Sequence, residues 1–399
     1  MHGHASRLGI AAGAVGKRES TVEGLDVIVD ITETLAGHRV FVTGHTGFKG
    51  SWLALWLSEL GAEVHGFALE PPTEPSLFEV AQVSGILAAH TLSDVRDPDA
   101  VQRAVAAAEP DVVFHLAAQS LVRESYLDPR GTVDTNVLGT VNVLEAVRAL
   151  RRPCAVVVVT SDKCYENHDW VWGYRENDRI GGHDPYSMSK GAAELVVTSW
   201  RRSFFAPERI AEHGVCLASA RAGNVIGGGD WQRDRIMADC VTALESGTPI
   251  RVRNPASTRP WQHVLEPLSG YLLLAARMLA GRPEEVAGFA DAWNFGPAMA
   301  DVWPVRRLAD EVIRHWGAGS WNDVSNPHEP HEARLLALNC DKAHQALAWR
   351  PTWDATRAVA ETITWHKARL AGEAMREVTL AQIRRFVAEA RERWSEAGR

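Results

Sequence analysis

A tyrosine and a lysine lie four residues apart in the segment Tyr186-Ser187-Met188-Ser189-Lys190. If the segment is helical, the two side chains share one face, because residues i and i+4 of a helix are neighbours. A tyrosine, whose ordinary pKa is about 10, acts as a base near neutral pH only if a cation stabilises its phenolate. The spacing therefore predicts that Tyr186 is a base and that Lys190 supplies the charge. Because this pattern also occurs by chance on surface helices, the surrounding sequence decides whether Tyr186 and Lys190 are catalytic.

A loop with three glycines, Gly44-His45-Thr46-Gly47-Phe48-Lys49-Gly50, follows a short apolar run and precedes an apolar-rich segment. Between a strand and a helix, such glycines permit a tight turn and let backbone N–H groups approach a pyrophosphate. The loop therefore predicts a dinucleotide site, and an oxidised nicotinamide there would add to the charge that stabilises the phenolate. We expect cofactor contacts from these residues of the loop: Gly44, Thr46, Gly47, Phe48, Lys49 and Gly50.

Two acidic positions bear on the identity of the dinucleotide. An acidic residue at the end of the second strand holds the adenosine ribose of NAD. The expected position is Ala68, and Glu70 is a displaced substitute. No Arg or Lys lies there to receive the 2′-phosphate of NADP, so NAD is favoured by that absence. Asp94, followed by Val95, either bonds the adenine amino group or serves as a helix cap or turn carboxylate.

Short apolar runs alternate with helical segments from Gly37 onwards. We expect strands over 37–43, 63–67, 111–116, 155–159 and 214–220, with helices over 51–60, 136–150 and 186–200. Continuous β-branched runs that alternate with helices indicate a parallel sheet covered on both faces. The expected fold is α/β, a Rossmann-type doubly wound parallel sheet with a smaller C-terminal substrate-binding domain.

The chain is expected to divide into three parts. Residues 1–36 carry no sustained periodicity and are predicted to form a poorly ordered extension, and residues 37–223 form the dinucleotide-binding domain. After about Asn224, loops rich in Gly, Arg, Pro and Trp interleave with short helices, which indicates a second domain, 224–399, over the carboxyl ends of the strands. It contains a docked surface helix over 380–394, where apolar residues recur at helical spacing.

Composition excludes several classes of protein. The 399 residues are 46% apolar and 23% charged, which is average for a globular chain and excludes disordered, collagen-like and coiled-coil proteins. A net charge of −8 disfavours nucleic acid as a partner, because that affinity depends on neutralising phosphates. No apolar run approaches the ~20 residues of a membrane span. Five scattered cysteines without a CxxC pair fit reduced thiols, so we expect a cytoplasmic protein.

Six segments together resemble the extended short-chain dehydrogenases/reductases and, within that group, the CDP-glucose 4,6-dehydratases. They are Val42–Trp52, Pro71–Phe78, His115–Gln119, Thr160–Asn167, the Tyr186–Lys190 motif and Arg221–Trp231, and the resemblance covers about Gly37 to the C-terminus. The Thr160-Ser161-Asp162-Lys163 segment discriminates best. A 4-epimerase needs no acid to expel hydroxide, and dehydratases of the thymidine type carry an Asp-Glu pair in place of Asp162-Lys163.

The resemblance implies an NAD-dependent lyase that converts CDP-glucose to CDP-4-keto-6-deoxyglucose by C4 oxidation, elimination of water across C5 and C6, and return of hydride to C6. In the implied chemistry Tyr186, assisted by Thr160, removes the C4 hydroxyl proton. Lys163 takes the C5 proton, and Asp162 protonates the C6 hydroxide. Burial would have to keep Lys163 partly neutral and Asp162 partly protonated, and which group holds which proton stays open.

The resemblance also implies further contacts, and no metal is expected. Leu116, Ala117 and Ala118 join the cofactor contacts, and the substrate contacts are Gln119, Ser161, Asn224 and Arg259, with the segment Trp261–Val264 completing the pocket. Arg259 is the first choice for the diphosphate among the arginines of this region, which are Arg221, Arg233, Arg235, Arg251, Arg253 and Arg259.

Alternatives within the same fold are a 4-epimerase, a dehydratase of another nucleotide sugar, and a catalytically silent dinucleotide-sensing protein. The last needs only the glycine loop, so the presence of Thr160, Tyr186 and Lys190 argues against it. The resemblance further implies a homodimer or a dimer of dimers, in which the helices over 136–150 and 186–200 pair between subunits.

Overall fold

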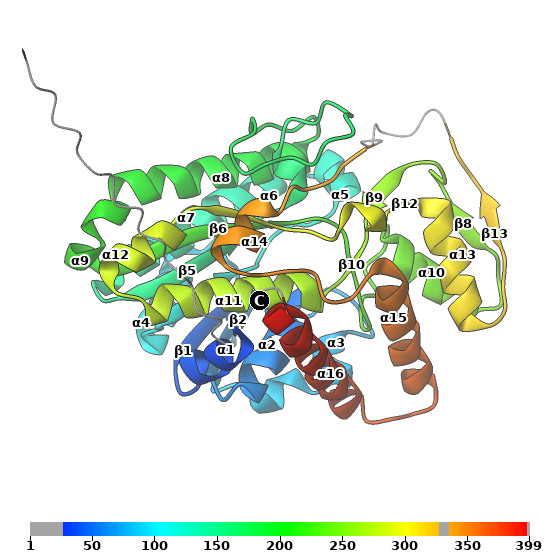
Figure 1. Ribbon diagram of the computed structural model, residues 1–399, viewed down its shortest axis with the longest axis horizontal. Coiled ribbons are helices and arrows are strands. Elements are labelled where there is room, and N and C mark those ends of the chain that lie inside the picture. Colours follow the sequence, from blue (N-terminus) through cyan, green and yellow to red (C-terminus); the bar gives the residue numbers. More distant parts are fainter. Residues whose placement is uncertain (1–26, 327–334, 397–399) are drawn as a thin grey trace, which may run out of the picture.

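A seven-stranded, wholly parallel sheet forms the centre of the protein (Figure 1). The computed structural model describes residues 27–326 and 335–396 of the chain. The order of the strands is β11-β6-β5-β4-β1-β2-β3, so β2 and β3 are added on one side of β1, and β4 and the later strands on its other side. Their bounds are β1 (Arg39–Thr43), β2 (Glu63–Ala68), β3 (Ala89–Leu92), β4 (Val112–His115), β5 (Cys154–Val159), β6 (Val215–Ala222) and β11 (Ala292–Phe295). The expected doubly wound Rossmann-type sheet is confirmed.

Two helical layers bury the two faces of the sheet, and the strand residues alternate between them. Val40 and Val42 of β1 belong to a core that includes α2 (Phe48–Glu59) and α11 (Leu265–Ala280). Phe41 of the same strand belongs to the opposite core, with α4 (Pro98–Ala108), α7 (Gly139–Leu150) and α8 (Pro185–Ser203). Because both faces are covered, all six residues of β5 and all eight of β6 are buried, which explains their continuous apolar sequence.

A second part of the chain covers one end of the sheet and has a core of its own. Figure 1 shows its helices α10 (Ile236–Glu245), α13 (Val305–Trp316) and α15 (Ala355–Leu370) beside the sheet. Three two-stranded sheets belong to it, made from β7 (Val225–Ile226) and β10 (Gln262–His263), β9 (Thr258–Pro260) and β12 (Val302–Pro304), and β8 (Ile250–Val252) and β13 (Trp321–Asp323).

The expected division after residue 223 stays a prediction, and residues 224–399 belong mainly, but not entirely, to the second part of the chain. Helix α11 and strand β11 follow residue 224 in sequence but return to the main sheet, where β11 pairs with β6. The physical reason is that the edge of β6 is completed by hydrogen bonds to a later strand. Short helices complete the described chain: α3 (Leu77–Val80), α5 (Val122–Leu127), α6 (Pro129–Val133), α9 (Ile210–His213), α12 (Pro283–Val286) and α14 (Asp341–Ala346).

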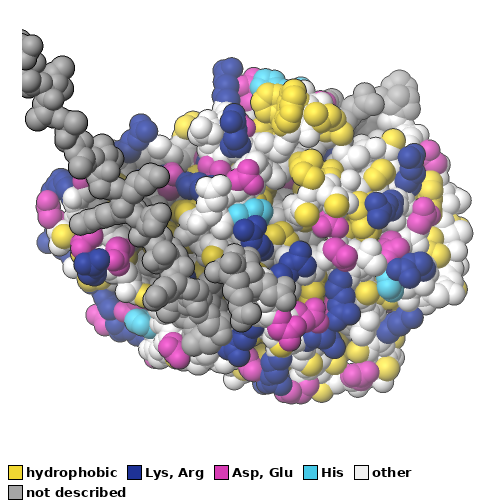
Figure 2. Space-filling model, viewed as in Figure 1, with side chains coloured by type: hydrophobic (Ala, Val, Ile, Leu, Met, Phe, Trp, Pro, Cys, Tyr) yellow, Lys and Arg dark blue, Asp and Glu magenta, His cyan; other side chains and the backbone are white. Residues whose placement is uncertain are grey.

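The last helix, α16 (Met375–Glu396), confirms and extends the surface helix expected over 380–394. It buries Ile383, Phe386, Ala390 and Trp394 at helical spacing and packs against α2. Figure 2 shows acidic and basic side chains mixed over the face in view. Within the described ranges, no helix is long and apolar enough to cross a bilayer.

Helix α1 (Val27–Leu35) corrects the expectation that residues 1–36 are poorly ordered. Ile31 and Leu35 lie one turn apart and are buried, and the helix contacts α11 and α16. Nine residues are too few to show a periodicity, and the helices that cover this stripe come from distant parts of the sequence. Residues 1–26 lie outside the described residues.

We expect Leu35→Ala to lower the free energy of unfolding by about 2–5 kcal/mol, because it opens a cavity under α1. Glu33→Ala, on the exposed side of the same helix, is the matched control and should leave the value almost unchanged. Urea unfolding followed by circular dichroism measures both. Equal stability of Leu35→Ala and the wild type would show that α1 does not pack on the fold in solution.

Candidate active site

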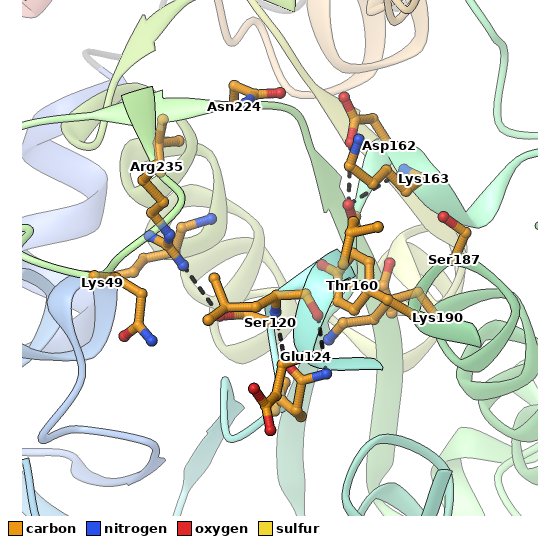
Figure 3. Close-up of a pocket in the computed structure, with 18 of the residues that line it drawn as sticks. Lys49, Ser120, Glu124, Thr160, Asp162, Lys163, Ser187, Lys190, Asn224 and Arg235 are labelled. Atoms are coloured by element: carbon orange, nitrogen blue, oxygen red, sulfur yellow. Dashed lines mark hydrogen bonds between the residues drawn. The ribbon is translucent and has the colours of Figure 1, made fainter. Parts of the chain in front are cut away.

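A cavity of about 1220 Å³ lies at the carboxyl ends of the strands, where sheets of this type bind ligands. Figure 3 shows Thr160, Asp162, Lys163 and Lys190 on one side of it, with Lys49 and Arg235 on the other. The following residues that the sequence placed in functional roles line this cavity: Gly44, Thr46, Gly47, Phe48, Lys49, Gly50, Glu70, Asp94, Val95, Leu116, Ala117, Ala118, Gln119, Thr160, Ser161, Asp162, Lys163, Tyr186, Lys190, Asn224 and Arg259. Of the segment Trp261–Val264, only Trp261 lines it. Their individual roles stay predictions.

The glycine loop has the close contacts that a dinucleotide cradle requires. Gly44 has a φ of 77°, and a Cβ there would lie 2.8 Å from the backbone nitrogen of Ala117. A Cβ at Gly50 would lie 2.1 Å from the carbonyl oxygen of Gly44, so neither position tolerates a side chain. Gly47 leaves the N-terminus of α2 without a side-chain cap. These features fit a pyrophosphate held by backbone N–H groups.

The carboxylate of Asp94 is occupied by hydrogen bonds within its own turn. Its carboxylate accepts hydrogen bonds from the backbone and the guanidinium of Arg96, and the guanidinium bond holds the pKa of Asp94 below its usual value. The cap of α4 is Asp97, whose side chain accepts from the backbone of Asp99 and Ala100. Of the roles left open by the sequence, the structure favours the turn carboxylate for Asp94.

Tyr186 and Lys190 lie on the first turns of α8 and are both buried. Asp184 caps this helix by accepting from the backbone of Ser187 at 2.9 Å, and Pro185 occupies its first position. Burial raises the pKa of Tyr186 to about 12. Burial lowers the pKa of Lys190 to about 8, against the opposing effect of Glu194, so the lysine is mostly protonated at neutral pH. The cation that lowers the pKa of Tyr186 against burial is Arg235, and the role of Lys190 as the charge for the phenolate stays a prediction.

The hydroxyl beside Tyr186 is Ser161, where the sequence expected Thr160. Ser161 lowers the pKa of Tyr186 against the larger effect of burial, whereas Thr160 is not among the groups that shift this pKa. The Thr160 hydroxyl instead donates to Glu194 Oε1 at 2.5 Å. Adjacent residues of an extended segment point in opposite directions, so only one of two neighbouring hydroxyls can face the tyrosine. The hydroxyl of Thr160 is thus occupied by Glu194, and its assisting role stays a prediction.

Behind this segment lies a buried ion pair that the sequence did not reveal. Glu194 Oε2 accepts from the Arg221 guanidinium at 2.7 Å and from Ser219 at 2.8 Å, and both charged side chains are almost completely buried. Glu194 follows Lys190 by one helical turn, so the same i+4 spacing that links Tyr186 to Lys190 was available as a signal. The pair joins α8 to β6 and holds the hydroxyl of Thr160.

Asp162 is suited to the role of an acid. It is only 2% exposed, and burial raises the pKa of its carboxyl despite the opposing effects of Lys163, Ser161 and Arg259. Its Oδ1 accepts from the Ser161 hydroxyl at 3.0 Å, whereas Oδ2 has no hydrogen-bond partner among the described residues. A Cβ at Gly223 would lie 2.9 Å from Oδ2, so this glycine leaves room for the carboxyl.

Two of the side chains expected to bind substrate, Gln119 and Arg259, make hydrogen bonds within the protein. Gln119 lines the cavity, but its amide nitrogen donates to Leu121 and Thr132, so this side chain braces the loop. Arg259 is buried on β9 and donates to the Thr258 carbonyl oxygen at 2.8 Å. Arg235, Arg251 and Arg253 also line the cavity, unlike Arg233.

Arg235 connects two walls of the cavity and was not singled out by the sequence. Its guanidinium pairs with Asp230 at 3.0 Å and donates to the Ser120 hydroxyl at 3.1 Å (Figure 3). Across the described residues, His, Cys, Asp and Glu form no group of three or more able to hold a metal ion.

The sequence matches the model of one protein family and known proteins whose names describe the same kind of reaction. The model of the GDP-mannose 4,6-dehydratase family matches residues 41–362. The chain is 50% identical over 339 residues to a CDP-glucose 4,6-dehydratase from Salmonella typhimurium, which covers 85% of this chain and 93% of that protein. It is 28% identical over 345 residues to a dTDP-glucose 4,6-dehydratase from Streptomyces antibioticus, with 82% and 92% covered.

Solved structures share the fold. A dTDP-glucose 4,6-dehydratase from Streptomyces venezuelae, solved with NAD bound, has a TM-score of 0.69 at 22% identity and covers 84% of this chain and 98% of its own. A UDP-glucose 4-epimerase from Thermotoga maritima, solved with UDP-glucose, has the same TM-score at 21% identity, with 83% and 99% covered. The fold alone therefore does not separate a dehydratase from an epimerase.

We expect Glu194→Gln to lower the free energy of unfolding by about 3–5 kcal/mol, because it leaves the Arg221 charge buried without its partner. Glu212→Gln breaks an ion pair with Arg209 that is exposed on both sides and should change nothing measurable. Urea unfolding of the two variants and the wild type gives the comparison. Similar small changes in both variants would contradict the importance assigned to the buried pair.

Proposed function

The chain belongs to the GDP-mannose 4,6-dehydratase family, and from this membership and its cavity we propose that it is a hydro-lyase that converts CDP-glucose to CDP-4-keto-6-deoxyglucose. The observation that carries the proposal is Asp162, a buried carboxyl with a raised pKa in the same cavity as Tyr186 and Lys190. An epimerase would need the tyrosine and the lysine but no acid. Cytidine as the base rests on the 50% identical relative.

NAD is the cofactor that we propose. The loop from Gly44 to Gly50 and the N-terminus of α2 would hold its pyrophosphate, Glu70 its adenosine ribose, and Leu116 to Ala118 would line the path between them. When bound, NAD supplies the acceptor and later the donor of the hydride that moves from C4 to C6 of the sugar. The side chains of the protein must then recognise three parts of the substrate: the sugar hydroxyls, the diphosphate and the base.

The proton steps follow from the surroundings of each side chain. Tyr186, as a phenolate stabilised by Lys190, removes the C4 hydroxyl proton. The new ketone acidifies the C5 proton, and Lys163 removes it. Asp162 then protonates the departing C6 hydroxide. Burial raises the pKa of Asp162 despite the neighbouring cations, and this direction supports the role of an acid for its carboxyl.

A dimer formed through α7 and α8 is part of the proposal. Large apolar side chains are exposed on and beside these helices: Tyr126, Leu127, Leu138, Met188 and Leu195. Such a set next to two long helices supports pairing with the same helices of a second subunit. A cytoplasmic location is also part of the proposal, and the five cysteines are free and buried, in keeping with a reducing compartment.

The experiment that tests the function is incubation of the purified protein with CDP-glucose and NAD. A dehydratase forms a 4-ketosugar that absorbs in base, and NADH does not accumulate in step with product because the hydride returns to the sugar. A CDP-hexose inverted at C4 would indicate an epimerase. NAD binding without turnover would indicate a dinucleotide-sensing protein, and either result would reject the proposal.

We expect Tyr186→Phe to lower kcat by about 10²–10⁴-fold, because it removes the base that takes the C4 proton. The affinity for CDP-glucose should change little, since the ring remains in place. Steady-state kinetics and a binding titration measure the two quantities. Tyr126→Phe, at an exposed tyrosine outside the cavity, is the control and should keep the wild-type kcat. Near-normal turnover of Tyr186→Phe would contradict the assignment of Tyr186 as the base for the C4 hydroxyl.

Lys163→Met keeps much of the side-chain volume but deletes the proposed base for C5. We expect a single turnover to stop after oxidation, and the sugar recovered by acid quench should be oxidised at C4 with its C6 hydroxyl intact. The wild type in deuterated water should give product with one solvent deuterium at C5. Lys367→Met, outside the cavity, is the control. Wild-type dehydration by Lys163→Met would place the base elsewhere, with Glu166 the next candidate.

A further inference from the structure

A chain of buried side chains links the end of β1 to helix α8. Thr43 is the last residue of β1, directly before Gly44 of the glycine loop, and its hydroxyl lies 2.8 Å from Nδ1 of His115 on β4. Nε2 of His115 lies 3.1 Å from the hydroxyl of Thr140 on α7. The chain therefore crosses from the strand that leads into the glycine loop to the layer of helices that contains α8.

Asn136, just before α7, continues the chain to α8. The hydroxyl of Thr140 donates to the carbonyl oxygen of Asn136 at 2.8 Å, and the amide nitrogen of Asn136 donates to the hydroxyl of Ser189 at 2.8 Å. Ser189 in turn donates to the carbonyl oxygen of Tyr186 at 2.7 Å. The chain thus ends on the backbone of the residue proposed as the base for the C4 hydroxyl.

The hydrogen-bonding capacity of the Thr43 hydroxyl determines the tautomer of His115. A hydroxyl has one proton and two lone pairs, and the backbone N–H groups of Leu116 and Ala117 both donate to Thr43 Oγ1 at 3.1 Å. The hydroxyl proton is therefore directed to Nδ1 of His115, which must accept it. Nε2 then carries the ring proton and donates to the hydroxyl of Thr140. His115 is thus a neutral ring in the Nε2–H form.

Burial makes each bond of the chain necessary. Thr43 and Ser189 are completely buried, and His115, Thr140 and Asn136 are each 2% exposed. A buried polar group that loses its partner destabilises the protein, because no water replaces the lost hydrogen bond. Burial also lowers the pKa of His115 to about 3, in agreement with the neutral ring that the hydrogen bonds require.

Helix α8 is therefore held by two polar networks. The ion pair of Glu194 holds it to β6 and, through Thr160, to the segment after β5. The chain through His115 holds its first turn to the strand that ends at the glycine loop. The first network fixes Tyr186 relative to the proposed acid and base of the elimination, and the second fixes it relative to the loop proposed to hold the cofactor.

We propose that His115 is a positioning residue for the oxidation at C4, an inference that rests on the proposed function. Its neutral ring sets the distance between the glycine loop and Tyr186, which takes the C4 hydroxyl proton. Oxidation removes a hydride from C4 and a proton from the oxygen on C4, so both acceptors must be in place at the same time. Removal of the C5 proton and of the C6 hydroxide transfers no hydride and does not depend on this distance.

The test separates the two kinds of step with two substrates. CDP-6-deoxyglucose has no leaving group at C6, so it reports the C4 oxidation alone, as NADH absorbance in a single turnover. CDP-4-keto-6-deoxyglucose in deuterated water reports exchange of the C5 proton without hydride transfer. At saturating ligand we expect His115→Phe to slow the oxidation by about 10²-fold, the effect of a displacement of about 1 Å, and to leave the exchange almost unchanged.

Thr140 offers the matched comparison. Thr140→Val keeps the shape of the side chain but removes the bond to His115, so it should also slow the oxidation, and Thr140→Ser should restore the wild-type rate. Because the two side chains act through one bond, the double variant His115→Phe/Thr140→Val should be no slower than His115→Phe alone. Thr362→Val is the control, since the Thr362 hydroxyl donates to the carbonyl oxygen of Ala358, as that of Thr140 does to Asn136, but lies on α15.

Two measurements do not depend on turnover. Affinity for NAD, titrated by tryptophan fluorescence, should change little in His115→Phe, because the backbone bonds of Leu116 and Ala117 to Thr43 use lone pairs that do not involve the histidine. In the wild type, the imidazole ¹H–¹⁵N signals that disappear in His115→Phe should show the Nε2–H form unchanged between about pH 5 and 8, where ordinary histidines titrate.

Equal losses of C4 oxidation and C5 exchange would overturn the proposal and leave His115 with a structural role only. A histidine that titrates in this range, or a loss of NAD affinity as large as the loss of rate, would also overturn it. Circular dichroism establishes that the variants are folded, and if His115→Phe is not, Thr140→Val gives the same comparison. Failure of the proposed function is seen separately, since the wild type would then neither oxidise CDP-6-deoxyglucose nor exchange the C5 proton.

Discussion

The buried ion pair between Glu194 and Arg221 is the constraint on which the active site depends. Two charges inside the protein are tolerated only when they are paired and their remaining hydrogen-bonding groups are satisfied. Glu194 meets this condition with Arg221, Ser219 and Thr160, and Arg221 also donates to the phenol of Tyr165 and to the carbonyl oxygen of Glu176. One pair therefore joins α8, the end of β5, β6 and the loop after β5. The position of the catalytic segment is a consequence of satisfying this buried charge.

The same low-polarity interior adjusts the groups that move protons. Burial pushes the pKa of Asp162 up and that of Lys190 down, because it penalises whichever form is charged. Glu194 opposes this effect at Lys190 and keeps that side chain mostly protonated at neutral pH. An acid and a cation can thus coexist in one cavity, since each has a different balance of burial and neighbouring charge.

The second part of the chain closes the cavity from the other side. Arg235 bridges Asp230 to Ser120 of the loop after β4, and Arg259 is held against its own strand. These arginines line the same cavity as the glycine loop, and Arg235 lies on the same side of it as Lys49 of that loop (Figure 3). The cavity thus brings arginine side chains from late in the sequence together with backbone groups from its start, a combination that the proposed dinucleotide and nucleotide sugar would both need.

The sequence by itself determined the features that repeat over short distances. Alternating apolar runs and helices predicted the parallel sheet, the glycine loop predicted its cofactor cradle, and the spacing from Tyr186 to Lys190 predicted a shared helix face. Because the carboxyl ends of parallel strands meet at one edge, residues that follow different strands were expected together, and all of them line the cavity. These predictions succeed because each depends on the local periodicity of the chain.

Only the tertiary structure decided matters that depend on distant partners. It showed that the Thr160 hydroxyl donates to Glu194, that the Gln119 amide braces a loop, and that α1 is ordered against α11 and α16. It also brought β11 back to the sheet beside β6. The physical reason is common to all four: the choice between two adjacent side chains, or between order and disorder, is made by burial against residues that the local pattern does not contain.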